Sequence, residues 1–193
     1  MATAKIYDAE LDPTKNELVA RFSSIAQLQG SYRAFDRDDK VGIEVHVGTD
    51  EEGSLTQCGV TYREEAMALD DALTPLTHSV LGPRSVAQLT ADPVAVREFV
   101  QMILNGDAGA DFSTGEPIFA VRGTGSGDAV VEDVEIETHD MLNSVGTLTV
   151  DGEEKRYQLR LQRIISDQPA ADEGDLALVR EDGAILMNLS LWD

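Results

Sequence analysis

Residues 41–48 contain the feature of this sequence that most restricts its fold. Apolar residues alternate strictly with small or polar ones, in the order Val-Gly-Ile-Glu-Val-His-Val-Gly. Successive side chains of a β-strand point to opposite faces, so this two-residue period predicts a strand with one apolar face. Residues 49–53 have a turn composition, and residues 54–63 return as a partner strand. The pattern predicts an antiparallel pair in which Glu44 and His46 share the polar face.

Two segments have helical periodicity instead. The first is predicted to begin at Asp12-Pro13, because the aspartate can cap free N–H groups and proline fits the first turn, and to end at Gly30. The second, residues 93–104, follows the Asp-Pro pair at 92–93 and precedes Asn105-Gly106, which is typical of a helix C-terminus. The expected apolar stripes are Leu18, Val19, Phe22 and Ile25 in the first helix and Val96, Phe99, Val100 and Ile103 in the second.

The other segments with alternating residues predict a sheet-rich chain. Asp151-Gly152 and Asp182-Gly183 lie between alternating runs and indicate hairpins. A strand, a helix and then antiparallel strands predict an α+β fold, with a sheet wrapped on one helix in the cystatin-like order β-α-β-β-β and a strand-rich C-terminal half. The expected strands are residues 4–11, 32–35, 76–81, 117–122, 129–138, 146–150, 156–165, 176–180 and 184–192, with an exposed linker at 166–174.

The length of 193 residues predicts about one domain. A segment rich in Gly, Ala and Asp, residues 107–115, is the expected internal boundary. We therefore expect an α+β domain at residues 1–106 and a β-rich extension at residues 107–193, packed on the first as one globular unit.

The charge balance restricts the partners. Fifteen Lys and Arg against 36 Asp and Glu give a formal charge of −21, which argues against nucleic acid or an anionic membrane as partner because both require cationic neutralisation. The N-terminus has no basic segment followed by an apolar run, and no apolar stretch reaches 18 residues. Cys58 is the single cysteine, so an internal disulfide is excluded. These features predict a cytoplasmic protein.

Several local patterns resemble catalytic motifs but lack the necessary context. Gly-Thr-Gly-Ser-Gly at residues 123–127 precedes a predicted strand rather than the helix that a phosphate-binding loop requires, so a flexible hairpin loop is expected. His139-Asp140 followed by Asn143 lacks the spacing and the partner motifs of a kinase catalytic loop. Cys58 has no histidine nearby in pattern and is expected in the sheet interior. We therefore assign no catalytic residue and expect no cofactor.

A polar cluster is the one candidate binding site. If the polar side chains of several predicted strands converge, they form a cluster able to bind a small anion or a polyol; the alternative is a surface network of ion pairs and hydrogen bonds. A metal is not expected, because the two histidines and one glutamate have no ligand spacing. The cluster consists of Glu44, His46, Tyr62, His78 and Arg84.

Five short segments occur in an order that resembles a known family. They are Pro-Thr-Lys-Asn-Glu-Leu at 13–18, Val-Gly-Ile-Glu-Val-His at 41–46, Val-Thr-Tyr-Arg at 60–63, His-Ser-Val-Leu-Gly-Pro-Arg at 78–84 and Asp-Pro-Val at 92–94. Together they are similar to the maltokinase N-terminal cap-like family of actinobacteria, over about residues 1–106. Family members often continue with aromatic residues where this chain has Ser85-Val86-Ala87.

The resemblance implies a cystatin-like cap in maltose, trehalose and α-glucan metabolism. It implies no kinase activity, because the catalytic lobes that follow the cap in a maltokinase are missing from this sequence. The leading hypothesis is a non-catalytic accessory module that contacts a kinase or a glucan-metabolism enzyme. Two alternatives stay open, a protein that binds a sugar or sugar phosphate and an enzyme that acts on α-glucans. A homodimer is compatible with the predicted sheet edges.

Overall fold

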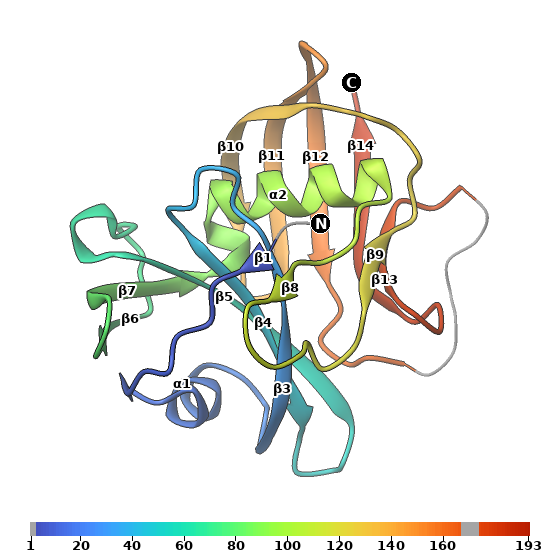
Figure 1. Ribbon diagram of the computed structural model, residues 1–193. Helices are drawn as coiled ribbons and strands as arrows, with labels where there is room; N and C mark the ends of the chain where they lie inside the picture. The colour runs from blue at the N-terminus through green and yellow to red at the C-terminus, as the bar shows by residue number, and fades with distance from the viewer. Residues whose placement is uncertain (1–2, 167–173) are drawn as a thin grey trace.

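The computed structural model describes residues 3–166 and 174–193, which form two six-stranded sheets and two α-helices (Figure 1). The first sheet has the order β2-β6-β7-β5-β4-β3, and each neighbouring pair is antiparallel. Its strands are β2 (Leu11–Asp12), β3 (Gln27–Ala34), β4 (Gly42–Thr49), β5 (Leu55–Glu64), β6 (Thr74–His78) and β7 (Gly82–Gln88).

The second sheet, also antiparallel, has the order β10-β11-β12-β14-β13-β9. Both hairpins predicted from Asp-Gly pairs are confirmed, since β11 pairs with β12 and β13 with β14. The predicted α+β class with antiparallel sheets is confirmed. The strands are β9 (Val121–Gly123), β10 (Val131–His139), β11 (Asn143–Val150), β12 (Glu153–Leu161), β13 (Ala177–Arg180) and β14 (Ile185–Trp192); β1 (Thr3–Ala4) and β8 (Asp111–Phe112) form a separate parallel pair.

Helix α1 (Lys15–Phe22) covers part of one face of the first sheet. Leu18 and Val19 of the predicted stripe pack there with Cys58 and Val60 of β5. The predicted bounds are wrong at both ends. Thr14 rather than Asp12 caps the helix, in a reciprocal capping box with Glu17, because Asp12 pairs in β2. The helix ends at Phe22, and Gly30, the expected stop, lies within β3.

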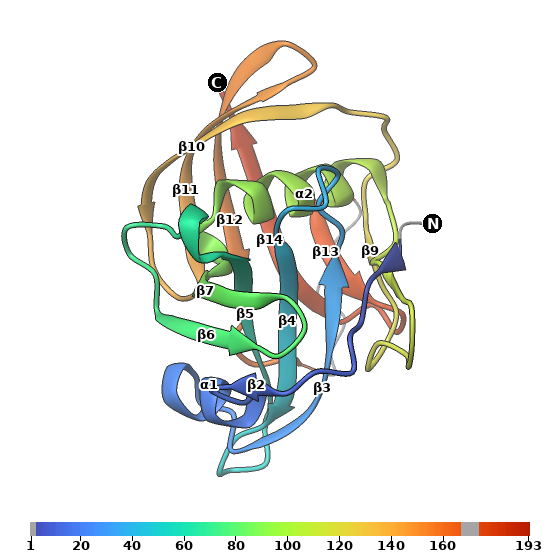
Figure 2. The same ribbon diagram turned by 60° about the vertical axis from the view of Figure 1, so that its left-hand side comes forward.

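Helix α2 (Pro93–Asn105) lies across the strands of the second sheet in both views (Figure 1, Figure 2). Phe99 and Ile103 of its predicted stripe are fully buried. They belong to one apolar core that also contains Val45 of the first sheet and Leu159 and Leu186 of the second. Residues on either side of the expected boundary at 107–115 therefore share this core.

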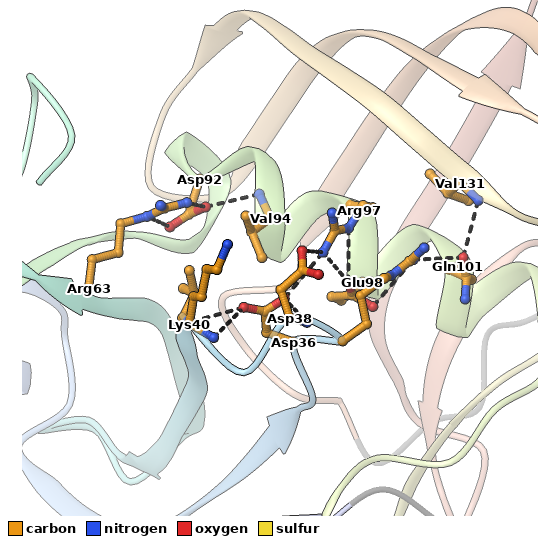
Figure 3. A network of polar contacts seen from close by, with 12 residues as sticks. Asp36, Asp38, Lys40, Arg63, Asp92, Val94, Arg97, Glu98, Gln101 and Val131 are labelled. Carbon is orange, nitrogen blue, oxygen red and sulfur yellow. Dashed lines mark hydrogen bonds and ion pairs between the residues drawn. The ribbon is translucent and has the colours of Figure 1, made fainter. Parts of the chain in front are cut away.

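Asp92 confirms the predicted start of α2 and also forms a buried ion pair. Its carboxylate accepts a hydrogen bond from Val94 N at 3.0 Å, which caps the helix. The same carboxylate accepts two hydrogen bonds from Arg63 of β5, at 2.7 and 2.6 Å (Figure 3). One side chain thus fixes the helix start against the first sheet.

A second group of ion pairs connects α2 to the turn between β3 and β4 (Figure 3). Arg97 Nη2 lies 3.2 Å from Asp36 Oδ1, and Glu98 accepts a hydrogen bond from Arg37 Nε at 2.9 Å. Asp36 is buried and also accepts from the backbone N–H groups of Lys40 and of the residue after it, both at 2.9 Å. These contacts fix the β3–β4 turn, which forms one wall of the pocket described below.

Residues 123–127 do not form the hairpin loop that was expected, because β9 and β10 are not neighbours in the sheet. Their amides cap the C-terminal end of α2: Gly125 N donates to Ile103 O at 2.9 Å and Gly127 N to Leu104 O at 3.1 Å. A Cβ at Gly125 would lie only 2.1 Å from Leu104 O, which explains the glycine. The segment therefore satisfies free helix carbonyls rather than holding an anion.

Other predicted elements differ in extent. Residues 4–11 form no continuous strand, since only β1 and β2 at either end pair with other strands. The predicted strand at 32–35 is the end of a longer strand, β3. The predicted linker at 166–174 lies largely outside the described residues. Within the described ranges, neither α-helix combines the length and the apolar character needed to cross a membrane.

Candidate ligand-binding pocket

A pocket of about 610 Å³ opens beside α1, on the same face of the first sheet that the helix partly covers. The register places the side chains of Arg33, Glu44 and Tyr62 on this face, because Arg33 pairs with Glu44 and Gly42 pairs with Tyr62. Arg84 and His78 follow on β7 and β6. All five residues line the pocket.

The N-terminal strap, residues 3–12, contributes the opposite wall. Figure 2 shows the course of its backbone from β1 to β2. Its first end is held by the pairing of β1 with β8 and by a 2.8 Å hydrogen bond from Ile6 N to Ser113 Oγ. Its second end is held by the pairing of β2 with β6 and by a 2.9 Å hydrogen bond from Glu10 N to Ser79 Oγ. Tyr7 lies between these attachments and lines the pocket.

Glu44 forms the polar floor and is completely buried. Its carboxylate accepts hydrogen bonds from Lys15 Nζ at 2.7 Å, Ser31 Oγ at 2.6 Å and Arg33 Nη2 at 2.7 Å. Burial alone would raise the pKa of Glu44, but the charges of Arg33 and Lys15 outweigh it and hold the pKa well below its usual range. Glu44 is therefore ionised and fixes the two cations in the pocket.

His46 lies behind this floor and does not line the pocket. Its Nε2 is 2.9 Å from the hydroxyl of Tyr62 and 3.9 Å from Glu44 Oε2. Burial lowers the pKa of His46 to about 4, although the Glu44 carboxylate opposes the shift. Burial, with a smaller effect of Glu44, raises the pKa of Tyr62 well above its usual value. Near neutral pH this pair is uncharged and holds the Tyr62 ring against the pocket.

His78 is held at the end of β6 by the turn that follows it. Its Nδ1 accepts hydrogen bonds from Val80 N at 3.2 Å and Leu81 N at 3.1 Å. The Tyr7 ring meets the His78 ring edge-on, with centroids 5.7 Å apart. Because Nδ1 is an acceptor, the neutral ring carries its proton on Nε2.

Arg84 is a cation of the pocket whose charge is only weakly balanced. Its Nη2 donates to the backbone carbonyl of Leu81 at 3.0 Å, and its buried Nε has no hydrogen-bond partner among the described residues. The facing carboxylate, Glu64, lies 3.8 Å away and its side chain is 65% exposed. An ion pair of this kind is worth little in water.

The pocket concentrates positive charge on a very acidic protein. Five of the 15 Lys and Arg residues line it, but only four of the 36 Asp and Glu residues do. The basic residues are Lys5, Lys15, Arg33, Lys40 and Arg84, and the acidic ones are Asp36, Asp39, Glu44 and Glu64.

The structure thus brings together four of the five residues of the predicted cluster around one pocket and places His46 directly behind them. The sequence analysis missed Arg33, Lys15 and the strap. Arg33 follows the alternation of β3, but its position opposite Glu44 depends on a strand register that the sequence pattern did not provide. Within residues 3–166 and 174–193, no three His, Cys, Asp or Glu side chains form a group that could hold a metal ion.

Comparison with known proteins gives no match: no family model matches the chain, and neither a curated protein nor a solved structure matches it significantly. The maltokinase cap-like resemblance therefore stays a proposal.

Proposed function

We propose that this protein binds a small molecule, a sugar or a sugar phosphate, in the pocket between the strap and the first sheet. The observation that carries the proposal is the polar floor, in which Glu44 is buried and fixes Lys15 and Arg33 by hydrogen bonds of 2.7 Å. Side chains that are already held in place favour binding, because they lose little conformational entropy when the ligand binds.

The size and chemistry of the pocket fit such a ligand. Its volume of about 610 Å³ lies in the range of small-molecule sites. Donors from the cations, together with exposed acceptors such as Asp39, suit hydroxyl groups that both donate and accept. Tyr7 lines the pocket and provides an aromatic ring on which the apolar face of a sugar could stack.

The same contacts favour binding over proton transfer. Glu44 already accepts three hydrogen bonds and stays ionised, so it has no proton to donate and little basicity to offer. Tyr62 is kept protonated and bonded to His46. These side chains hold one another in fixed positions, which suits ligand binding rather than proton transfer.

Thermal unfolding with maltose, trehalose and their phosphates tests the proposal. A ligand present at a hundred times its Kd stabilises the folded state by about 2.7 kcal/mol, which raises Tm by roughly 5–10 °C in a chain of this size. The variant Ala9→Trp places a large ring on the strap wall of the pocket and should abolish the shift, whereas Val130→Trp, at an exposed position outside it, should keep it. No shift with any of these ligands at 10 mM would contradict the proposal.

We also propose, as a second candidate, the cytoplasmic accessory module that the maltokinase cap-like resemblance implies, with a cystatin-like relation for α1 and the strands that follow it. The observation that favours it is the exposure of Val80 (56%) and Leu81 (39%) beside the pocket mouth. This chain is mixed with a purified maltokinase from the same organism and passed over a size-exclusion column with light-scattering detection. A complex should be detected, and the substitution Val80→Lys should weaken it. A mixture that elutes as separate components would reject this function.

A further inference from the structure

The pocket contains a cationic corner, formed by Lys15, His78 and Arg84. We propose that this corner is an anion subsite that binds the phosphate group of a phosphorylated ligand. The inference rests on the proposed function and deepens it, because it names the ligand class and the three side chains that recognise it.

The topology brings these residues together from three elements. His78 and Arg84 lie on adjacent strands, where Leu76 pairs with Arg84 and His78 pairs with Gly82, so the two side chains are diagonal neighbours on one face. Leu11 of the strap pairs with His78, and Lys15 begins the helix that follows. All three residues line the pocket.

His78 presents a fixed donor. The backbone N–H groups of Val80 and Leu81 occupy Nδ1, so the neutral ring keeps its proton on Nε2, which has no hydrogen-bond partner in the described chain. Burial lowers the pKa of His78, and the nearby charges of Arg84 and Lys15 add to this effect, although a hydrogen bond to the backbone opposes it. Because no carboxylate accepts from Nε2, this donor is available to a ligand.

The charges at the corner are incompletely balanced. Glu44 shares its negative charge between Lys15 and Arg33, and the guanidinium of Arg84 faces only the distant, exposed carboxylate of Glu64. Around the corner, Lys15, Arg33 and Arg84 therefore carry three positive charges against the two carboxylates of Glu44 and Glu64, even while His78 is neutral. A bound phosphate would remove this imbalance and accept hydrogen bonds from several donors at once.

The acidity of the rest of the chain does not prevent anion binding here. At physiological ionic strength charges are screened over about 8 Å, so the nearby cations dominate the potential inside the pocket. Two cations of the corner also have restricted positions, since Lys15 is bonded to Glu44 and Arg84 to the carbonyl of Leu81.

Proton NMR titration of the histidine rings tests the subsite directly, because the chain has only three histidines. The titrations use sulfate, which stays a dianion throughout, glucose 1-phosphate, and chloride at equal ionic strength. We expect either anion to raise the pKa of His78 by about one unit, which corresponds to a tenfold preference for the imidazolium form. Assignment comes from the signal that disappears in His78→Gln.

The variant Arg84→Gln should raise the pKa of His78 in chloride, because a neighbouring cation is lost, and should weaken the response to both anions about tenfold. The control Arg156→Gln, which removes a guanidinium paired with Glu137 on the second sheet, should leave both results unchanged. A His78 pKa that sulfate and glucose 1-phosphate leave unchanged, or that shifts equally in Arg84→Gln, overturns the subsite. If maltose still raises Tm in that case, the proposed function survives and only the phosphate preference is lost.

Discussion

Replacing His46 by glutamine tests how the buried polar floor responds to acid. The pKa of His46 falls from its ordinary value of 6.5 to about 4 in the folded protein, chiefly because burial disfavours the charged ring. The unfolded chain therefore binds a proton more readily than the folded one, and stability decreases as the pH falls from 6.5 to 4. The charged and titratable groups around the ring are Glu44, Lys15, Arg33 and Tyr62.

The magnitude follows from the two pKa values. Between pH 7.5 and pH 4.5 a group with these values lowers the free energy of unfolding by about 2.5 kcal/mol. Glu44 contributes little in this range, because its pKa is depressed and its stabilising effect is lost only below about pH 4.5. Urea denaturation at four pH values gives the free energy of unfolding of wild type and of His46→Gln. The difference between the two proteins should change by about 2.5 kcal/mol from pH 7.5 to pH 4.5.

Cys58→Ala is the matched control. Cys58 pairs with His46 across the strands and is also buried, but burial raises the pKa of its thiol to about 11, so it does not titrate in acid. This variant should lose stability equally at every pH and keep the wild-type dependence. A constant difference between wild type and His46→Gln from pH 7.5 to 4.5 would refute the argument that burial keeps His46 neutral.

Three further substitutions test other parts of the fold. Glu44→Gln should lower the free energy of unfolding by about 3 kcal/mol in urea denaturation, because two cations lose their carboxylate; a loss below 1 kcal/mol would contradict this. Gly125→Ala should cost about 3 kcal/mol in the same measurement, whereas Gly127→Ala, whose Cβ meets nothing closer than 3.5 Å, should be tolerated. Asp92→Asn should lower Tm by roughly 6–12 °C, because Arg63 is left without its buried partner; an unchanged Tm would show that the pair is dispensable.

The sequence pattern predicts the faces of the sheet better than the register of its strands. The alternation at residues 41–48 places Glu44 and His46 on one face, because a two-residue period has only one structural meaning. It does not say that Arg33 lies opposite Glu44, since that depends on the β3–β4 turn, which Asp36 and its contacts with α2 hold in place.

The strap and the helix cap were missed for related physical reasons. Residues 4–11 alternate like a strand, but only the two ends find a neighbour to pair with, and the middle is free to line the pocket. The glycines at 123 and 125 indicate close approach of backbone, but their partner, the end of α2, is distant in sequence from any local signal. Tertiary contacts, not local propensity, decide both segments.

The position of α2 has a consequence for the newly made chain. The helix is synthesised before every strand of the second sheet, yet Phe99 and Ile103 are buried against strands that the ribosome produces later. Until those strands emerge, the nascent polypeptide presents an uncovered apolar helix, which is the kind of surface that chaperones recognise. A stop codon placed after residue 106 would make that exposure permanent, so such a truncated product should precipitate or be degraded rather than accumulate as an independent domain.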